Sequence, residues 1–129
     1  MKVWGYLLVT PVLKDLEIID VSDGLKGTKL RCTAYIAEED DLGSDCFYFQ
    51  VVTSDYIINY LEKNQNILNC RATFVVQQFD LNVLKMEINY ILRDCIRTTW
   101  GETAQAINRF LKWEYDNVEL ISETEIISD

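Results

Sequence analysis

Two hydrophobic patterns with different periods divide the chain, and they constrain its fold more than any other feature of the sequence. Apolar and polar residues alternate along residues 30–36 and again along residues 46–52. A repeat of two is typical of strands that bury one face. Along residues 81–95 the apolar residues recur instead at the spacing of a helix with one buried stripe. The chain is therefore expected to change from strands to helices along its length.

Weaker signals extend this division. Residues 16–21 and 71–78 are predicted to be further strands, the latter because it is rich in β-branched and aromatic residues. Ser54 precedes a predicted short helix over residues 55–63. The sequence Thr99-Trp100-Gly101-Glu102 fits a capping box and predicts a second long helix, whose buried face would hold Trp100, Ala104, Ile107 and Leu111. The sequence thus predicts an α+β fold, with an antiparallel sheet of about four strands packed against helices mostly from the C-terminal half.

The length of 129 residues and the absence of a linker or a repeat indicate a single domain over residues 1–129. Residues 119–129 are expected to form a loose acidic tail. No apolar run reaches the length of a membrane-spanning helix, and the N-terminal residues do not fit a secretory signal. These features predict a cytoplasmic protein.

The net charge of −9 favours a protein partner. A negative field repels nucleic acid and anionic lipid, and it speeds the encounter with a basic protein. We therefore expect no direct nucleic-acid binding and no membrane binding. Carboxylates gather in the turn between the two alternating segments, and tyrosine is enriched at interface hot spots. The predicted partner-binding residues are Glu38, Glu39, Asp40, Asp41, Asp45, Tyr56 and Tyr60, with Tyr90 as a further candidate.

Residues that could carry catalysis are scarce. The chain has no histidine, which excludes histidine-based nucleophile systems and most catalytic zinc sites. The five glycines form no phosphate-binding loop, and the acidic turn lacks the ligand spacing of a calcium loop. The four cysteines contain no Cys-x-x-Cys pair and are expected to be reduced and buried. The sequence predicts no catalytic residue, no cofactor and no metal site, and hence a protein that is not an enzyme.

Several short motifs resemble one known family. They begin with Phe47-Tyr48-Phe49-Gln50 and continue through Tyr60-Leu61, Val75-Val76, Phe79-Asp80, Ile88, Tyr90-Ile91 and Cys95; the most specific are Thr99-Trp100 and Trp113-Glu114-Tyr115. In this arrangement, residues 30–118 resemble the immunity protein 8 family of bacterial polymorphic-toxin systems. The resemblance implies a cytoplasmic inhibitor of a cognate toxin domain that a neighbouring cell delivers, as in contact-dependent inhibition. It implies no catalytic residues. A basic nuclease is the toxin that the negative charge would suit.

Two other classes of protein stay open on the residues alone. One is a carboxylate- or cysteine-based hydrolase, which would show two facing acids in a cleft or an exposed cysteine of low pKa. The other is a non-catalytic subunit of a homo- or hetero-oligomer, including a homodimer that buries an edge strand.

Overall fold

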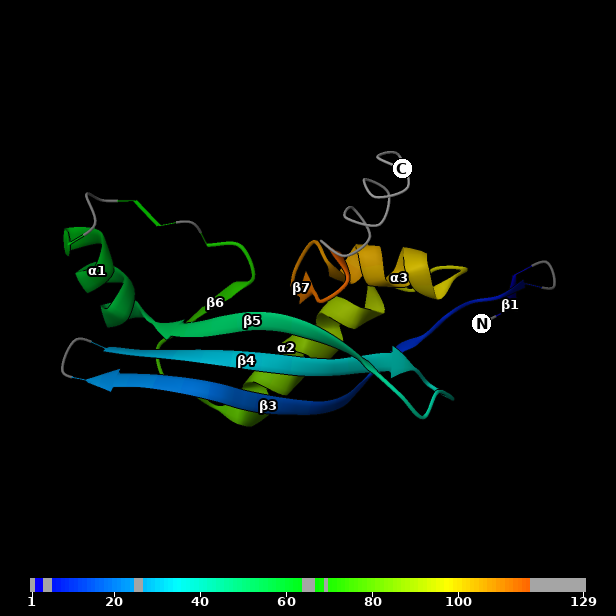
Figure 1. The fold of residues 1–129 in the computed structure, drawn as a ribbon, viewed down its shortest axis with the longest axis horizontal. Coiled ribbons are helices and arrows are strands. Elements are labelled where there is room, and N and C mark those ends of the chain that lie inside the picture. Colours follow the sequence, from blue (N-terminus) through cyan, green and yellow to red (C-terminus); the bar gives the residue numbers. More distant parts are fainter. Residues whose placement is uncertain (1, 4–5, 25–26, 64–66, 69, 117–129) are drawn as a thin grey trace, which may run out of the picture.

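Three long antiparallel strands form the centre of the molecule (Figure 1). They are β3 (Pro11–Gly24), β4 (Gly27–Glu38) and β5 (Asp45–Thr53). The computed structural model describes residues 2–3, 6–24, 27–63, 67–68 and 70–116, so the predicted acidic tail lies outside the described residues.

The two alternating segments form neighbouring strands, as their pattern predicts. Cys32 of β4 pairs with Phe49 of β5, and Ala34 pairs with Phe47. Because paired residues point to the same side of a sheet, the apolar residues of both strands face one core. Their buried side chains are Leu30, Cys32, Ala34, Ile36, Phe47, Phe49 and Val51.

Strand β3 extends beyond the predicted residues 16–21 and carries two irregularities. The register shifts between Leu13 and Asp15 and again between Ile18 and Asp20. A bulge inserts one residue, and it therefore lets Leu13 and Leu16 both pack on the core although an odd number of positions separates them. This interruption explains why the sequence of β3 does not alternate regularly.

The fourth main strand departs from the predicted antiparallel arrangement. Strand β6 (Thr73–Val76) pairs with β5 in parallel, which makes the sheet mixed. Helix α1 (Ser54–Lys63) lies between the two strands in the sequence. A strand–helix–strand connection allows the chain to return and pair in the same direction. The α+β class is confirmed.

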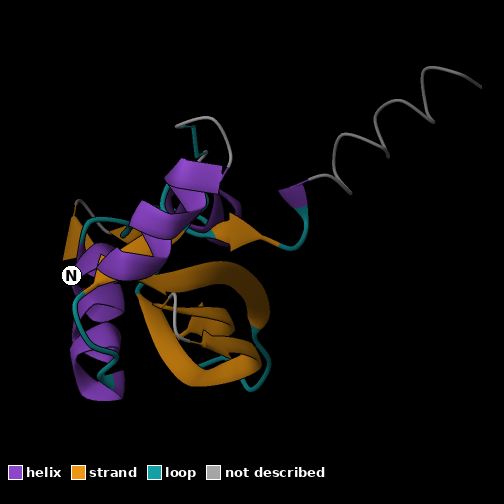
Figure 2. Cartoon of the chain, turned by 90° about the vertical axis from the view of Figure 1, so that its left-hand side faces the viewer, coloured by secondary structure: helices purple, strands orange, loops and turns teal. Residues whose placement is uncertain are grey.

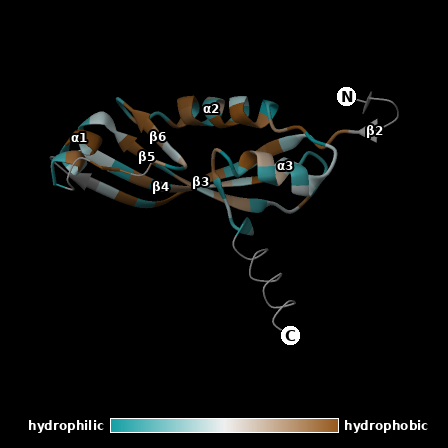
Figure 3. Cartoon of the chain, turned by 90° about the horizontal axis from the view of Figure 1, so that it is seen from above, coloured by the Kyte–Doolittle hydropathy of each residue, from teal (hydrophilic) through white to brown (hydrophobic). Residues whose placement is uncertain are grey.

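Helix α2 (Leu81–Arg93) closes the core on one face of the sheet (Figures 1 and 3). Figure 2 looks along the strands and shows how strongly they curve beside the helices. The Asp80 side chain begins α2 by accepting hydrogen bonds from the backbone N–H groups of Asn82 and Val83. Most of the predicted stripe is confirmed, since α2 buries Leu84, Ile88, Ile91 and Leu92. Leu81, with which the predicted stripe began, is instead exposed.

The predicted second long helix is shorter than its pattern suggests. Helix α3 (Trp100–Ile107) begins at the predicted Thr99 cap, where the Thr99 hydroxyl oxygen accepts the Glu102 N–H at 3.1 Å. It ends before Leu111, which is fully buried but lies in the following turn. The chain turns there because the Asn108 side-chain oxygen accepts the Trp113 N–H at 2.9 Å.

Short strands complete the fold. After the turn, β7 (Lys112–Trp113) pairs with β5 on the same edge as β6. Strands β1 (Lys2–Val3) and β2 (Tyr6–Leu7) form a small separate sheet. Within the described part of the chain, no helix is long and apolar enough to cross a membrane.

Candidate partner-binding surfaces

The predicted acidic turn is the hairpin loop between β4 and β5 (Figure 1). Glu39, Asp40 and Asp41 are exposed, and Glu38 is half-buried at the end of β4. The Asp41 N–H donates to the Glu38 carbonyl at 3.1 Å, and the Asp41 carboxylate accepts the Gly43 N–H at 3.0 Å. These hydrogen bonds close two turns within the loop and support its conformation.

At the tip of this loop, Leu42 stands fully exposed. It follows two exposed carboxylates, Asp40 and Asp41. An apolar side chain surrounded by charge can enter a pocket of a partner while the charges remain at the rim. We refer to residues 38–45 as the acidic hairpin.

Asp45, at the base of the acidic hairpin, has an internal role. Its Oδ2 atom accepts the indole N–H of Trp100 at 2.9 Å and that of Trp113 at 3.0 Å. Both indole rings pack on Phe47, Trp113 in a stacked arrangement and Trp100 edge-on. Asp45 thereby ties the hairpin to α3 and β7. Its contact with a partner stays a prediction.

The predicted tyrosines do not join the acidic hairpin. Tyr56 and Tyr60 are half-buried on α1, with ring centroids 6.3 Å apart. Helix α1 follows the far end of β5, so the two tyrosines lie at the opposite end of the sheet from the hairpin (Figure 1). Tyr90 is 62% exposed on α2. A partner of ordinary size that covers the hairpin need not reach α1, and the interface role of these tyrosines stays a prediction.

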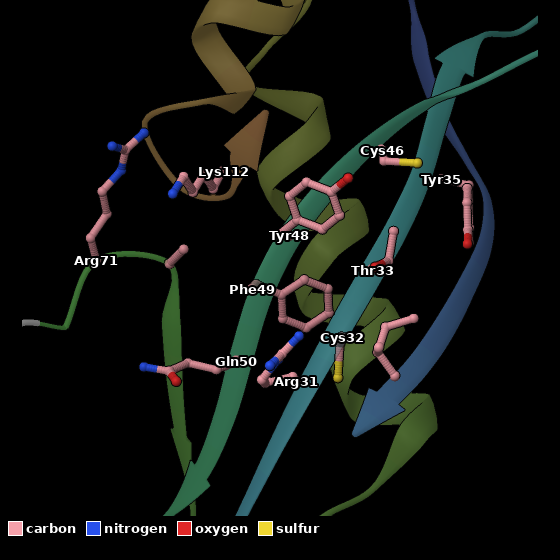
Figure 4. Close-up of a pocket in the computed structure, with 12 residues that line it drawn as sticks. Arg31, Cys32, Thr33, Tyr35, Cys46, Tyr48, Phe49, Gln50, Arg71 and Lys112 are labelled. Atoms are coloured by element: carbon pink, nitrogen blue, oxygen red, sulfur yellow. The ribbon is translucent and has the colours of Figure 1, made fainter. Parts of the chain in front are cut away.

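A groove that sequence reasoning missed lies on the sheet face opposite α2 (Figure 4). Its volume is about 600 Å³. We call it the sheet groove; the side chains that shape it include Arg31, Thr33, Tyr35, Tyr48, Gln50 and Lys112. Arg71 lines it from the segment before β6. Strands β4, β5 and β7 and the approach to β6 therefore all contribute to one concave surface.

The sheet groove is basic in an acidic protein. Its charged lining residues are Arg31, Arg71 and Lys112, and no carboxylate lines it among the described residues. The neighbouring Tyr35 hydroxyl donates to Glu17 on β3 at 2.8 Å, which raises the pKa of Tyr35 to about 12. Loss of water contact raises the pKa of Tyr48, so both phenols stay protonated near neutral pH.

The chemistry at this groove does not resemble an activated nucleophile. Cys46 lines it, and burial, followed by a hydrogen bond with Glu114, raises the pKa of its thiol. A reactive cysteine requires the opposite shift. In the part of the chain that the structure describes, no three Cys, Asp or Glu side chains are grouped to hold a metal ion.

Part of the lining of this groove could have been predicted from the sequence. Arg31, Thr33 and Tyr35 form the polar half of the alternation in β4, which places them on the outer face. The contribution of Arg71 and Lys112 depends on two distant segments that approach the edge of β5. No local sequence pattern predicts that these two segments come close to β5.

Comparison with known proteins assigns the family. A family model described as immunity protein 8 matches residues 21–118. No curated protein matched the chain, and no solved structure matched it. The matched span includes the acidic hairpin and all of the basic residues of the sheet groove. Because this match covers well over half of the sequence, the chain belongs to the immunity protein 8 family.

Proposed function

We propose that this chain is a cytoplasmic, non-catalytic immunity protein that binds a cognate toxin domain and neutralises it. The family match over residues 21–118 is the observation that carries the proposal. Its role would be to protect the producing cell, or its siblings, from a toxin of a polymorphic or contact-dependent system. The toxin itself would be encoded beside this chain.

The acidic hairpin is the surface we propose for the first encounter. Glu39, Asp40 and Asp41 are exposed together, and the net charge of the chain is −9. Such a surface attracts a basic partner over a distance and raises the association rate more than the final affinity. A nuclease toxin needs a basic face to hold phosphates, so it is the toxin class that this charge suits.

Leu42 is the apolar contact that we propose within this surface. Affinity at interfaces comes mainly from a few buried apolar or aromatic anchors, while the surrounding charges set rate and selectivity. The fully exposed Leu42 at the hairpin tip is the residue that could enter a pocket of the toxin. Asp45 and the two tryptophans would hold the hairpin in place for this contact.

Co-expression tests the proposal. The toxin domain encoded directly beside this chain is expressed in a sensitive host, with the chain or with an empty vector. We expect survival only with the chain, and a stable one-to-one complex when both proteins are purified. Survival no better than with the empty vector would contradict the proposed function. Survival without a complex would exclude neutralisation by direct binding.

A further inference from the structure

The sheet groove has the opposite charge to the acidic hairpin. All three of its charged lining residues are basic, although Asp and Glu outnumber Lys and Arg by 21 to 12 in the chain. Arg31 and Lys112 are exposed, and neither side chain makes a hydrogen bond or ion pair with another described residue. Arg71 donates to the backbone and side-chain oxygens of Asn108, which fixes its guanidinium beside the groove.

Polar side chains of the sheet form part of the lining of the groove. Thr33 is only 3% exposed and lines the groove from β4. Gln50 donates from Nε2 to the Thr73 hydroxyl at 2.8 Å, which orients the amide. Tyr48 is 44% exposed, and its ring also lines the groove (Figure 4). A ligand with carboxylate oxygens would find cations and hydroxyl donors on the same rigid surface.

The groove is continuous with the acidic hairpin. Tyr35 pairs with Cys46, and both line the groove. The next pair along the ladder, Ile36 with Asp45, stands at the base of the hairpin. A partner that contacts the hairpin can therefore extend an adjoining segment along the open face of β4 and β5.

We infer that the sheet groove receives an acidic segment of the partner protein, with a carboxylate held by Arg31 and Lys112. The inference rests on the proposed function for the identity of that partner, the toxin. Recognition would then use both signs of charge, with a basic toxin face at the hairpin and an acidic toxin segment in the groove. A protein with only a basic face, or with only an acidic segment, would match one of the two surfaces and would therefore bind more weakly.

A nucleic acid is the less favoured occupant. A long polyanion must approach the whole field of a chain of charge −9, and the acidic hairpin adjoins the groove. Glu17 on β3 also borders it through the Tyr35 hydroxyl. A short peptide segment with one or two carboxylates meets only the local cations, so its attraction survives the overall repulsion.

Charge reversal tests the inference on the complex with the toxin. In the double variant Arg31→Glu with Lys112→Glu, we expect the affinity for the toxin to fall at least about a hundredfold. The matched control reverses two exposed cations on α2, Lys85→Glu with Arg93→Glu, and we expect a change below about threefold. Equal affinities of the groove variant and the wild type would overturn the inference, as would an equal loss in the control.

A neutral variant separates binding from folding. Arg31 pairs across strands with Asp20, so reversal places two acids opposite each other. Arg31→Gln with Lys112→Gln avoids this repulsion and should give an intermediate loss of affinity at an unchanged melting temperature. A wild-type affinity in this folded variant would count against the groove.

Peptide titration distinguishes failure of the inference from failure of the proposed function. If the wild-type chain does not bind the toxin, isotope-labelled protein is titrated with a capped short peptide that carries two glutamates and, separately, with a twelve-nucleotide thymidine strand. We expect the diglutamate peptide to shift the amide signals of β4 and β5 around the groove, and we expect the double reversal to abolish the shifts. Tighter binding of the thymidine strand, or no shift with the diglutamate peptide, would overturn the inference.

Discussion

Trp100 and Trp113 donate their indole N–H groups to the same oxygen atom, Oδ2 of Asp45. Trp100 begins α3 and Trp113 ends β7, so one carboxylate joins two elements to the start of β5. Both rings also pack on the fully buried Phe47. The pair therefore anchors the acidic hairpin to the helical half of the molecule.

Removal of this acceptor should weaken the whole fold. Asp45→Ala leaves two indole N–H groups without their partner, and we expect a loss of about 2–4 kcal/mol in the free energy of unfolding. Asp45→Asn keeps a neutral acceptor and should cost less. Urea denaturation measures both, with the exposed Asp40→Ala as a control that should change stability by less than about 0.5 kcal/mol. Equal stability of Asp45→Ala and the control would show that the shared carboxylate is dispensable.

Gly27 should tolerate no side chain. Its φ of 103° is unfavourable for other residues, and an added Cβ would lie 2.7 Å from Cα of Tyr56 and against the Tyr56 backbone nitrogen. We expect Gly27→Ala to cost more than about 2 kcal/mol in thermal or urea unfolding. Gly101→Ala is the matched control, because nothing lies within 4 Å of its added methyl group and helix α3 should gain up to about 1 kcal/mol.

Ionisation of Glu102 should make the stability of the protein depend on pH. Hydrogen bonds from the Thr98 hydroxyl and then the Thr99 hydroxyl lower the pKa of its carboxyl in the folded state. A lowered folded pKa means that the stabilisation is present above the unfolded value and is lost as the pH falls through the folded value. We expect Glu102→Gln to lower the melting temperature at pH 7 and to differ less from wild type below about pH 4. A difference in melting temperature between the variant and wild type that is the same at all pH values would contradict this role.

The four cysteines should differ sharply in reactivity. Cys70 is exposed, whereas Cys32 and Cys95 are buried, and burial raises the pKa of Cys32 to about 11. We expect a disulfide reagent at pH 8 to label one thiol quickly in the native protein and all four after denaturation. Cys70→Ser should remove the fast reaction. If a fast thiol persists in that variant, it would indicate Cys46 and would revive the cysteine hydrolase alternative.

Charge on the acidic hairpin should control the rate of toxin binding. Glu39→Lys with Asp40→Lys keeps Asp41, whose side chain accepts the Gly43 N–H and orders the loop. We expect the association rate to fall about tenfold or more at low salt and to depend less on ionic strength, with little change in dissociation. The control, Glu62→Lys with Glu87→Lys, reverses two exposed acids on helices α1 and α2. An unchanged association rate in the hairpin variant would place the interface elsewhere.

The sequence predicted those elements whose pattern is local. The alternation in β4 and β5 and most of the helical stripe of α2 are confirmed because each element buries one face against a single core. The parallel pairing of β6 was not predicted, since the direction of a pair depends on the path of the chain through α1. The early end of α3 was also missed. Leu111 is buried, as its helical spacing suggests, but the Asn108 side chain redirects the backbone before it.

The candidate surfaces also differ in how far the sequence predicts them. The acidic hairpin was readable because its charges are consecutive in the sequence. The internal role of Asp45 was not, because its two donors lie 55 and 68 positions away. The sheet groove likewise needs Arg71 and Lys112 to approach from separate segments. Sequence patterns report what one element presents to the core, and they do not report which distant side chains meet on the outside.

The two bulges of β3 have a consequence for the behaviour of this protein at high concentration. Among the described strands, β3 pairs only with β4, so a border of 14 residues remains available to another chain. An uninterrupted border of this length would template fibrils, but the bulges break its regular spacing and Lys14 and Asp15 add exposed charge. The interrupted rim therefore disfavours the addition of a second copy of this chain along β3.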